Sequence, residues 1–97
     1  MNLFDYQTPR RGERFDTLLE TRNVRIVRIV SSDNIEPILY VQDDDEWVVV
    51  LEGEATLEVN GKEALLRKGD YLFIPASTPH RVIATAKGTL WLAVHIS

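Results

Sequence analysis

Two polar side chains at the starts of predicted strands, Glu46 and His80, have the clearest chemical potential in this 97-residue chain. Glu46 directly precedes the apolar run 47–51, and the period of two along a strand puts it on the same face as Val48 and Val50. If that face is interior, the carboxylate needs a cation or hydrogen bonds. His80 follows a proline-bounded loop and opens the next strand, where an imidazole can meet solvent or a ligand.

A carboxylate and an imidazole in one site permit two kinds of chemistry. Together they suit a divalent metal such as Fe, Mn, Zn or Ni, because these ions accept neutral imidazole and carboxylate oxygen as ligands. Without a metal, a carboxylate beside His80 favours imidazolium, which could orient an anionic ligand. A barrel that binds nothing and is retained as a stable dimer is a third alternative, and the last two alternatives stay open.

The stretch around His80 resembles the second sequence motif of the cupins. Five residues separate Gly69 from Pro75, one separates Pro75 from Ser77, and two separate Ser77 from His80. In this chain Ser77 stands where the cupin motif has glycine, and Ala84 stands where it has asparagine. The resemblance implies a small single-domain cupin, and therefore a jelly roll with one end at which the functional strands converge.

The stretch around Glu46 resembles the end of the first cupin motif. Six residues lie between Glu46 and Gly53, and the two resemblances together cover roughly residues 37–96. The two histidines that cupins usually supply to a metal fall on Tyr40 and Gln42 in this chain. The resemblance implies a pocket that holds a divalent metal through Gln42, Glu46 and His80, with an amide oxygen as the weak ligand.

The resemblance also predicts what else lines this pocket. Tyr40 and Phe73 are expected to line it, and His95 is a minor candidate, because the last strand of a jelly roll lies beside the strand that Glu46 opens. Water or a small-molecule substrate would complete the coordination of the metal. In the enzymes that the chain resembles, such a metal polarises a bound oxygen or carbonyl, or activates dioxygen. Whether this chain is an enzyme is left open.

Composition excludes several classes of protein. The chain has no cysteine, so it has neither a disulfide framework nor a thiolate metal site. Its net charge of −4 argues against nucleic acid as a partner, because nucleic-acid binders gather Lys and Arg on one face. No apolar run is long enough to span a bilayer, and the start has no signal-peptide pattern, so we expect a cytoplasmic protein without a membrane partner.

The rest of the chain predicts an all-β fold, an antiparallel jelly-roll barrel or sandwich, over residues 23–97. Short apolar or alternating runs with closely spaced turn signals indicate seven or eight strands. These runs are 24–30, 37–40, 46–51, 54–59, 64–66, 71–74, 81–86 and 89–96. The dipeptide Asn60-Gly61 is the strongest hairpin signal, because a type I′ turn needs positive φ at both central residues.

Residues 1–22 are expected to form a separate arm. Phe15, Leu18 and Leu19 are spaced like one face of a single helical turn after Asp16. The arm is predicted to pack on the outside of the barrel or to be exchanged with a second subunit. A homodimer is predicted, joined through this arm or through a sheet face.

Two tryptophans bear on the predicted dimer. Large aromatic residues in strands usually belong to a core or to an interface. Trp47 has the opposite parity to Glu46, while the parity of Trp91 is not fixed by the pattern. Both are therefore expected in the core or, of more interest, at the dimer interface.

Overall fold

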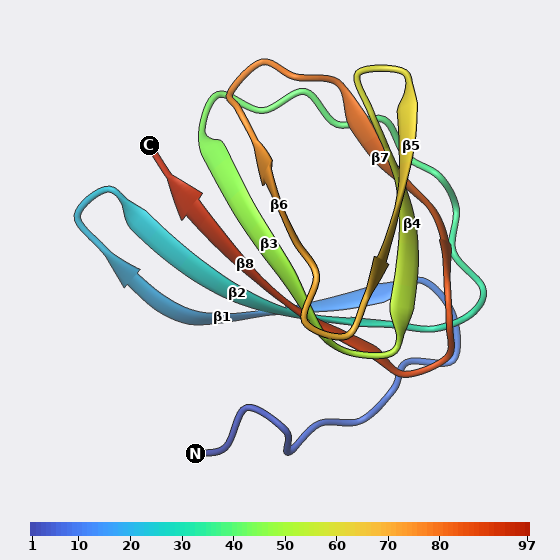
Figure 1. Ribbon diagram of the computed structural model, residues 1–97. Coiled ribbons are helices and arrows are strands. Elements are labelled where there is room, and N and C mark those ends of the chain that lie inside the picture. Colours follow the sequence, from blue (N-terminus) through green and yellow to red (C-terminus); the bar gives the residue numbers. More distant parts are fainter.

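A computed structural model describes residues 1–97 as two packed antiparallel β-sheets without a helix (Figure 1). The five-stranded sheet has the order β1-β2-β8-β3-β6, and the three-stranded sheet has the order β5-β4-β7. The eight strands are β1 (Glu13–Thr21), β2 (Val24–Ser31), β3 (Asp45–Glu52), β4 (Glu54–Val59), β5 (Lys62–Arg67), β6 (Tyr71–Ile74), β7 (His80–Thr85) and β8 (Thr89–Ile96). This is the predicted jelly-roll sandwich.

The core fills the space between the two sheets. Along β3 the buried residues alternate with more exposed ones, as the period of two requires: Val48 and Val50 face inward and Val49 faces outward. Both sheets supply the buried cluster, which consists of Val27, Ile29, Val48, Val50, Ala55, Leu57, Leu66, Ile74, Trp91 and Ala93. Glu46 has the same parity as Val48, so the predicted inward direction of this carboxylate is confirmed.

Two glycines make turns that other residues would strain. Asn60 and Gly61 have φ angles of 52° and 81°, which confirms the predicted hairpin between β4 and β5. Gly53, between β3 and β4, has a φ of 84°, and a Cβ atom there would clash with the Thr89 hydroxyl.

The prediction of a helical turn at Phe15, Leu18 and Leu19 is wrong. Residues 13–21 form β1, which pairs antiparallel with β2 at the edge of the larger sheet. The register shifts between Thr17 and Leu19, which is a β-bulge. The extra residue breaks the alternation of the strand and leaves the apolar residues at a spacing that imitates a helix.

The predicted strand from Pro37 to Tyr40 is also wrong. Only an isolated bridge joins Tyr40 to His80, through backbone hydrogen bonds of 2.8 Å and 3.0 Å between the two residues. The rest of the segment between β2 and β3 is irregular, because Pro37 lacks the N–H group that a ladder needs. This segment therefore runs along the open side of the sandwich and borders the cavity described below.

The first twelve residues run beneath the larger sheet in Figure 1. Arg28, on the outer face of β2, holds them by donating hydrogen bonds of 3.1 Å and 2.9 Å to the carbonyls of Leu3 and Asp5. The same guanidinium pairs with Asp16 on β1 at 2.9 Å.

No helix capable of crossing a membrane occurs in residues 1–97. The cytoplasmic location stays a prediction.

Candidate functional site

A cavity of about 290 Å³ lies between the two sheets at the end of the sandwich where β3 and β7 begin. Its walls are mostly apolar, and its polar groups come from five strands and from the segment before β3. The residues that line it are Glu13, Phe15, Thr17, Arg25, Val27, Ile29, Tyr40, Gln42, Glu46, Val48, Leu57, Ile74, His80, Val82, Trp91 and His95. An apolar cavity with a few convergent polar groups is the usual form of a small-molecule site.

Glu46 is buried at 8% exposure, one residue into β3 and between two neighbouring strands. It pairs in register with Ile74 on β6 and with His95 on β8. The only hydrogen bond that its side chain makes within the chain comes from the Gln42 amide, whose Nε2 lies 3.1 Å from Oε1. One carboxylate oxygen therefore remains without a donor from the protein.

His80 faces Glu46 across the cavity, with its Nε2 atom 3.7 Å from Oε1 of Glu46. Its Nδ1 atom lies 2.9 Å from the carbonyl oxygen of Thr78. A carbonyl only accepts, so Nδ1 carries a proton, and Nε2 faces Glu46 across the cavity. The separation from Glu46 is within ion-pair distance but too long for a hydrogen bond. Nε2 of His80 and the second carboxylate oxygen of Glu46 therefore have no hydrogen-bond partner within the chain.

His95, on β8, lies next to Glu46 of β3, as the resemblance implied. Its Nδ1 atom is 3.3 Å from Oδ2 of Asp44, which is within ion-pair distance. The same atom is nonetheless buried without a hydrogen bond, because the approach is poorly directed. Gln42 connects this pair to Glu46, since its amide also donates to Asp44 at 3.2 Å.

The predicted site residues are therefore mostly brought together. Tyr40, Gln42, Glu46, His80 and His95 all line the cavity. The ring of Tyr40 stacks on the imidazole of His80, with 5.9 Å between centroids and 27° between planes. Gln42 meets Glu46 with its donor group rather than with the oxygen that a metal would need.

Phe73 lies elsewhere than expected, whereas Trp91 lies in the core, one of its two expected places. Phe73 does not line the cavity: it lies on the outer face of β6 and is 52% exposed, because its parity is opposite to that of buried Ile74. Trp91 is not at a surface interface: it is 2% exposed, and its Nε1 donates a 2.9 Å hydrogen bond to the Ser31 hydroxyl. Trp47 remains on the outer face, where its ring meets Tyr71 at 5.7 Å.

Glu13 is a cavity residue that sequence reasoning missed. It opens β1, and its Oε2 atom accepts a hydrogen bond of 2.5 Å from the Ser31 hydroxyl. Burial raises the pKa of this carboxyl, the Ser31 hydrogen bond lowers it, and the negative charge of Glu46 raises it, with a net upward direction. The signal was the shared parity of Glu13, Phe15 and Thr17, which only a strand prediction for residues 13–21 would have revealed.

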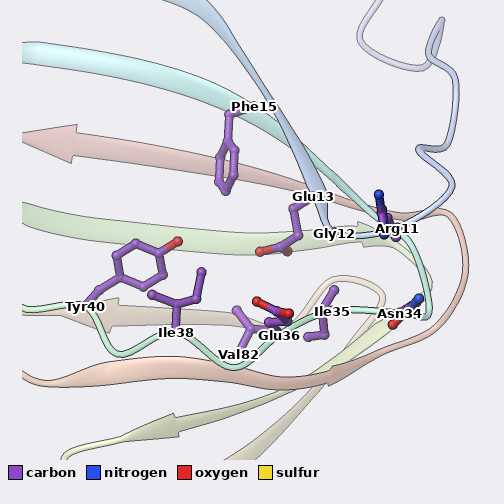
Figure 2. A pocket seen from close by; sticks show the side chains of 10 residues that line it. All are labelled: Arg11, Gly12, Glu13, Phe15, Asn34, Ile35, Glu36, Ile38, Tyr40 and Val82. Carbon is purple, nitrogen blue, oxygen red and sulfur yellow. The ribbon is translucent and has the colours of Figure 1, made fainter.

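A second cavity, of about 460 Å³, adjoins the first on the open side of the sandwich. The two cavities share Glu13, Phe15, Tyr40 and Val82. In Figure 2 the carboxylate of Glu13 and the hydroxyl of Tyr40 point toward one another across this space, and Phe15 projects into it from β1. Burial and the charges of Glu13 and Glu46 raise the pKa of Tyr40, so its phenol stays protonated.

A two-sheet jelly roll with a polar-ended cavity at one end defines a cupin-like barrel. The sequence profile of the cupin domain matches residues 31–95. The chain belongs to this family.

Three similar proteins illustrate the family. A structure from Ralstonia eutropha JMP134, provisionally assigned as a mannose-6-phosphate isomerase, is 37% identical, with a TM-score of 0.90 and coverage of 100% of this chain and 96% of that one. Quercetin 2,3-dioxygenase of Bacillus subtilis (strain 168) is 43% identical over 44 residues, which are 45% of this chain and 13% of that protein. The iron(II) form of HppE is 26% identical, with a TM-score of 0.75 and coverage of 88% and 50%.

The donor set of this chain does not fit a resident metal ion. No three His, Asp or Glu side chains converge closely enough in residues 1–97 to hold one. The positions of the two usual histidines hold Tyr40, a protonated phenol, and Gln42, whose amide nitrogen faces Glu46. Glu46 and His80 remain as two donors, whereas catalytic zinc sites use three protein ligands.

Proposed function

We propose that this cupin binds a small organic ligand in its barrel cavity without a resident metal, and that Glu46 and His80 form the polar end of the site. The observation that carries the proposal is the pair of facing polar side chains, with Nε2 of His80 3.7 Å from Oε1 of Glu46, both almost fully buried at the end of an apolar cavity. Buried polar groups without partners are costly, so a ligand that satisfies them gains affinity.

The apolar walls provide the rest of the binding energy. Val48 from β3, Ile74 from β6 and Trp91 from β8 lie on one side of the cavity, and Leu57 and Val82 come from the opposite sheet. Transfer of a ligand's carbon surface into such a cavity gives roughly 25 cal/mol per Å². The cavity supplies a mostly apolar space and a small number of orienting groups.

The first experiment measures metal in the purified chain. Elemental analysis after expression with Fe, Mn, Zn and Ni in the medium should find far less than one ion per chain. One ion per chain would overturn the proposal. A metal-dependent function would then be the better hypothesis, since the similar protein HppE has an iron(II) form.

The second experiment tests the cavity with benzyl alcohol as a small neutral probe. Binding to the wild type is followed by amide chemical shifts. In Val82→Trp a large side chain enters the cavity, and binding should be lost. Val49→Trp adds the same side chain on the outer face of β3 and should bind as the wild type does. Melting curves verify that both variants fold, and equal binding to both would contradict the proposal.

A further inference from the structure

The polar atoms that face the two cavities are mostly acceptors. Glu46 contributes carboxylate oxygens at one end of the inner cavity, and only one of them accepts a hydrogen bond within the chain. The amide nitrogen of Gln42 is already used, since it donates to Glu46 and to Asp44. The free space therefore offers a ligand more acceptors than donors.

Glu13 adds a second carboxylate on the wall that the two cavities share. One of its oxygens accepts from Ser31, and no side chain or backbone group donates to the other. The hydroxyl of Tyr40 points toward it without a hydrogen bond of its own (Figure 2). Glu13 and Glu46 are close enough for the negative charge of Glu46 to raise the pKa of Glu13.

No lysine or arginine side chain pairs with Glu13 or Glu46. Arg25 lines the inner cavity, but its Nε lies 4.0 Å from Glu20. Arg11 borders the outer cavity together with Glu36, which is of opposite charge. His95 lies beside Asp44. Apart from His80, whose Nε2 is 3.7 Å from Glu46, no basic side chain is within ion-pair distance of either carboxylate.

The surrounding surface is apolar and aromatic. Phe15 and Tyr40 border both cavities, and their ring faces can attract a cation. Valine, isoleucine and leucine side chains form the remaining inner wall. A ligand that matches the site therefore combines a donor-rich positive group with a carbon skeleton.

We propose that the ligand is an organic amine, bound as its ammonium form, whose N–H groups are shared between the carboxylates of Glu46 and Glu13. This deepens the proposed function and rests on it. An ammonium has three donors and no acceptor, which complements a site whose free polar atoms are acceptors. Charge-assisted hydrogen bonds to carboxylates are about twice as strong as neutral ones, so charge should dominate the choice of ligand.

The test compares three probes of nearly equal size, titrated at neutral pH into the full chain: benzylamine, benzyl alcohol and benzoate. Benzylammonium should bind roughly tenfold more tightly than benzyl alcohol, as one charge-assisted hydrogen bond would give, and benzoate should bind most weakly. Glu13→Gln and Glu46→Gln should each reduce the advantage of the amine over the alcohol. Glu63→Gln removes the same charge from exposed β5 and should leave that advantage unchanged.

The outcomes separate this inference from the proposed function. Binding of benzyl alcohol without any preference for the amine, or tighter binding of benzoate, would overturn the amine and leave the cavity as a ligand site. An amine preference that survives in both Glu13→Gln and Glu46→Gln would also overturn it. If none of the three probes binds, both proposals fall. Glu13→Gln keeps the acceptor for Ser31, so its fold should be retained, and its melting curve checks this.

Discussion

Ser31 and Glu13 face one another across the β1–β2 pair and are joined by a side-chain hydrogen bond of 2.5 Å. The Ser31 hydroxyl accepts from Trp91, so its single proton is directed to Glu13. This chain fixes a carboxyl group at the junction of two cavities although the residue belongs to neither cupin motif. The edge strand β1 thus contributes a carboxyl group to the two cavities as well as pairing with β2.

Glu13→Gln should make stability less dependent on pH. The pKa of Glu13 is raised above its ordinary value of 4.5, so the folded state is favoured while the carboxyl is protonated. That contribution is fully present below pH 4.5 and is lost as pH rises through the folded pKa. The variant should therefore lose less stability than the wild type as pH rises above 4.5 in urea unfolding. Glu63→Gln is the control, and parallel profiles for wild type and Glu13→Gln would contradict the expectation.

Glu46 and His80 should be energetically coupled. Glu46→Ala and His80→Ala each leave the other buried group without its partner, at a cost of ~1–3 kcal/mol. The double variant should cost less than the sum of the two. Urea unfolding of the four proteins measures this cycle. Strict additivity would show that the two side chains do not interact.

Gly61→Val should destabilise the β4–β5 hairpin. Gly61 has a φ of 81°, and a β-branched residue in this conformation is strained by ~1–3 kcal/mol. No atom lies within 4 Å of the position that a Cβ would occupy, so the cost comes from the backbone and not from a clash. Gly61→Asn should cost much less, because asparagine tolerates the left-handed region. Equal melting temperatures for the two variants would contradict this.

Ser77→Gly should leave stability unchanged or raise it slightly. Ser77 has a φ of 64°, and its N–H donates to the Gln42 carbonyl at 2.7 Å. Relief of a left-handed non-glycine residue gains ~1–2 kcal/mol, and the added freedom of the unfolded chain offsets ~0.4–1 kcal/mol of that. Ser77→Val should be clearly destabilising in the same thermal melts. A melting temperature for Ser77→Gly well below the wild type would contradict the backbone argument.

The predicted homodimer is best tested on the outer face of the larger sheet. Trp47, Tyr71 and Phe73 lie together there, and Tyr71 and Phe73 are 67% and 52% exposed. If this patch joins two copies, Phe73→Lys should halve the mass that light scattering reports. Leu65→Lys, at a comparably exposed apolar position on β5, should not. A wild-type mass of 11.1 kDa at micromolar concentration would exclude the dimer.

The sequence predicted the elements whose signals are local. Alternation along 46–51 gave the direction of Glu46, and Asn60-Gly61 gave the hairpin, because both depend on the pleat or on backbone φ alone. The approach of His95 to Glu46 needed the strand order, which came from the cupin resemblance. The prediction that Phe73 lines the cavity is wrong, because adjacent residues of a strand point to opposite faces and Ile74 points inward.

The errors at the N-terminal half share a different cause. The bulge near Leu18 destroys period-two alternation, and an isolated bridge at Tyr40 satisfies only one pair of residues. Neither leaves a regular pattern in the sequence. Glu13 was missed for this reason, since a residue in a presumed helical arm has no defined relation to a barrel cavity. Its role depends on long-range pairing with β2.

The irregular segment between β2 and β3 has a kinetic consequence. It carries Tyr40 and Gln42, which wall the inner cavity, yet near the site it is joined to the barrel by the two Tyr40–His80 bonds, the Ser77–Gln42 bond and the Gln42–Glu46 side-chain bond. Breaking these four bonds frees the segment while every strand pair stays intact. Such local openings cost less free energy than global unfolding. We therefore expect this segment to govern the release of the proposed ligand, and the amide protons of Tyr40 and Ser77 to exchange with solvent well before those of β3 and β8.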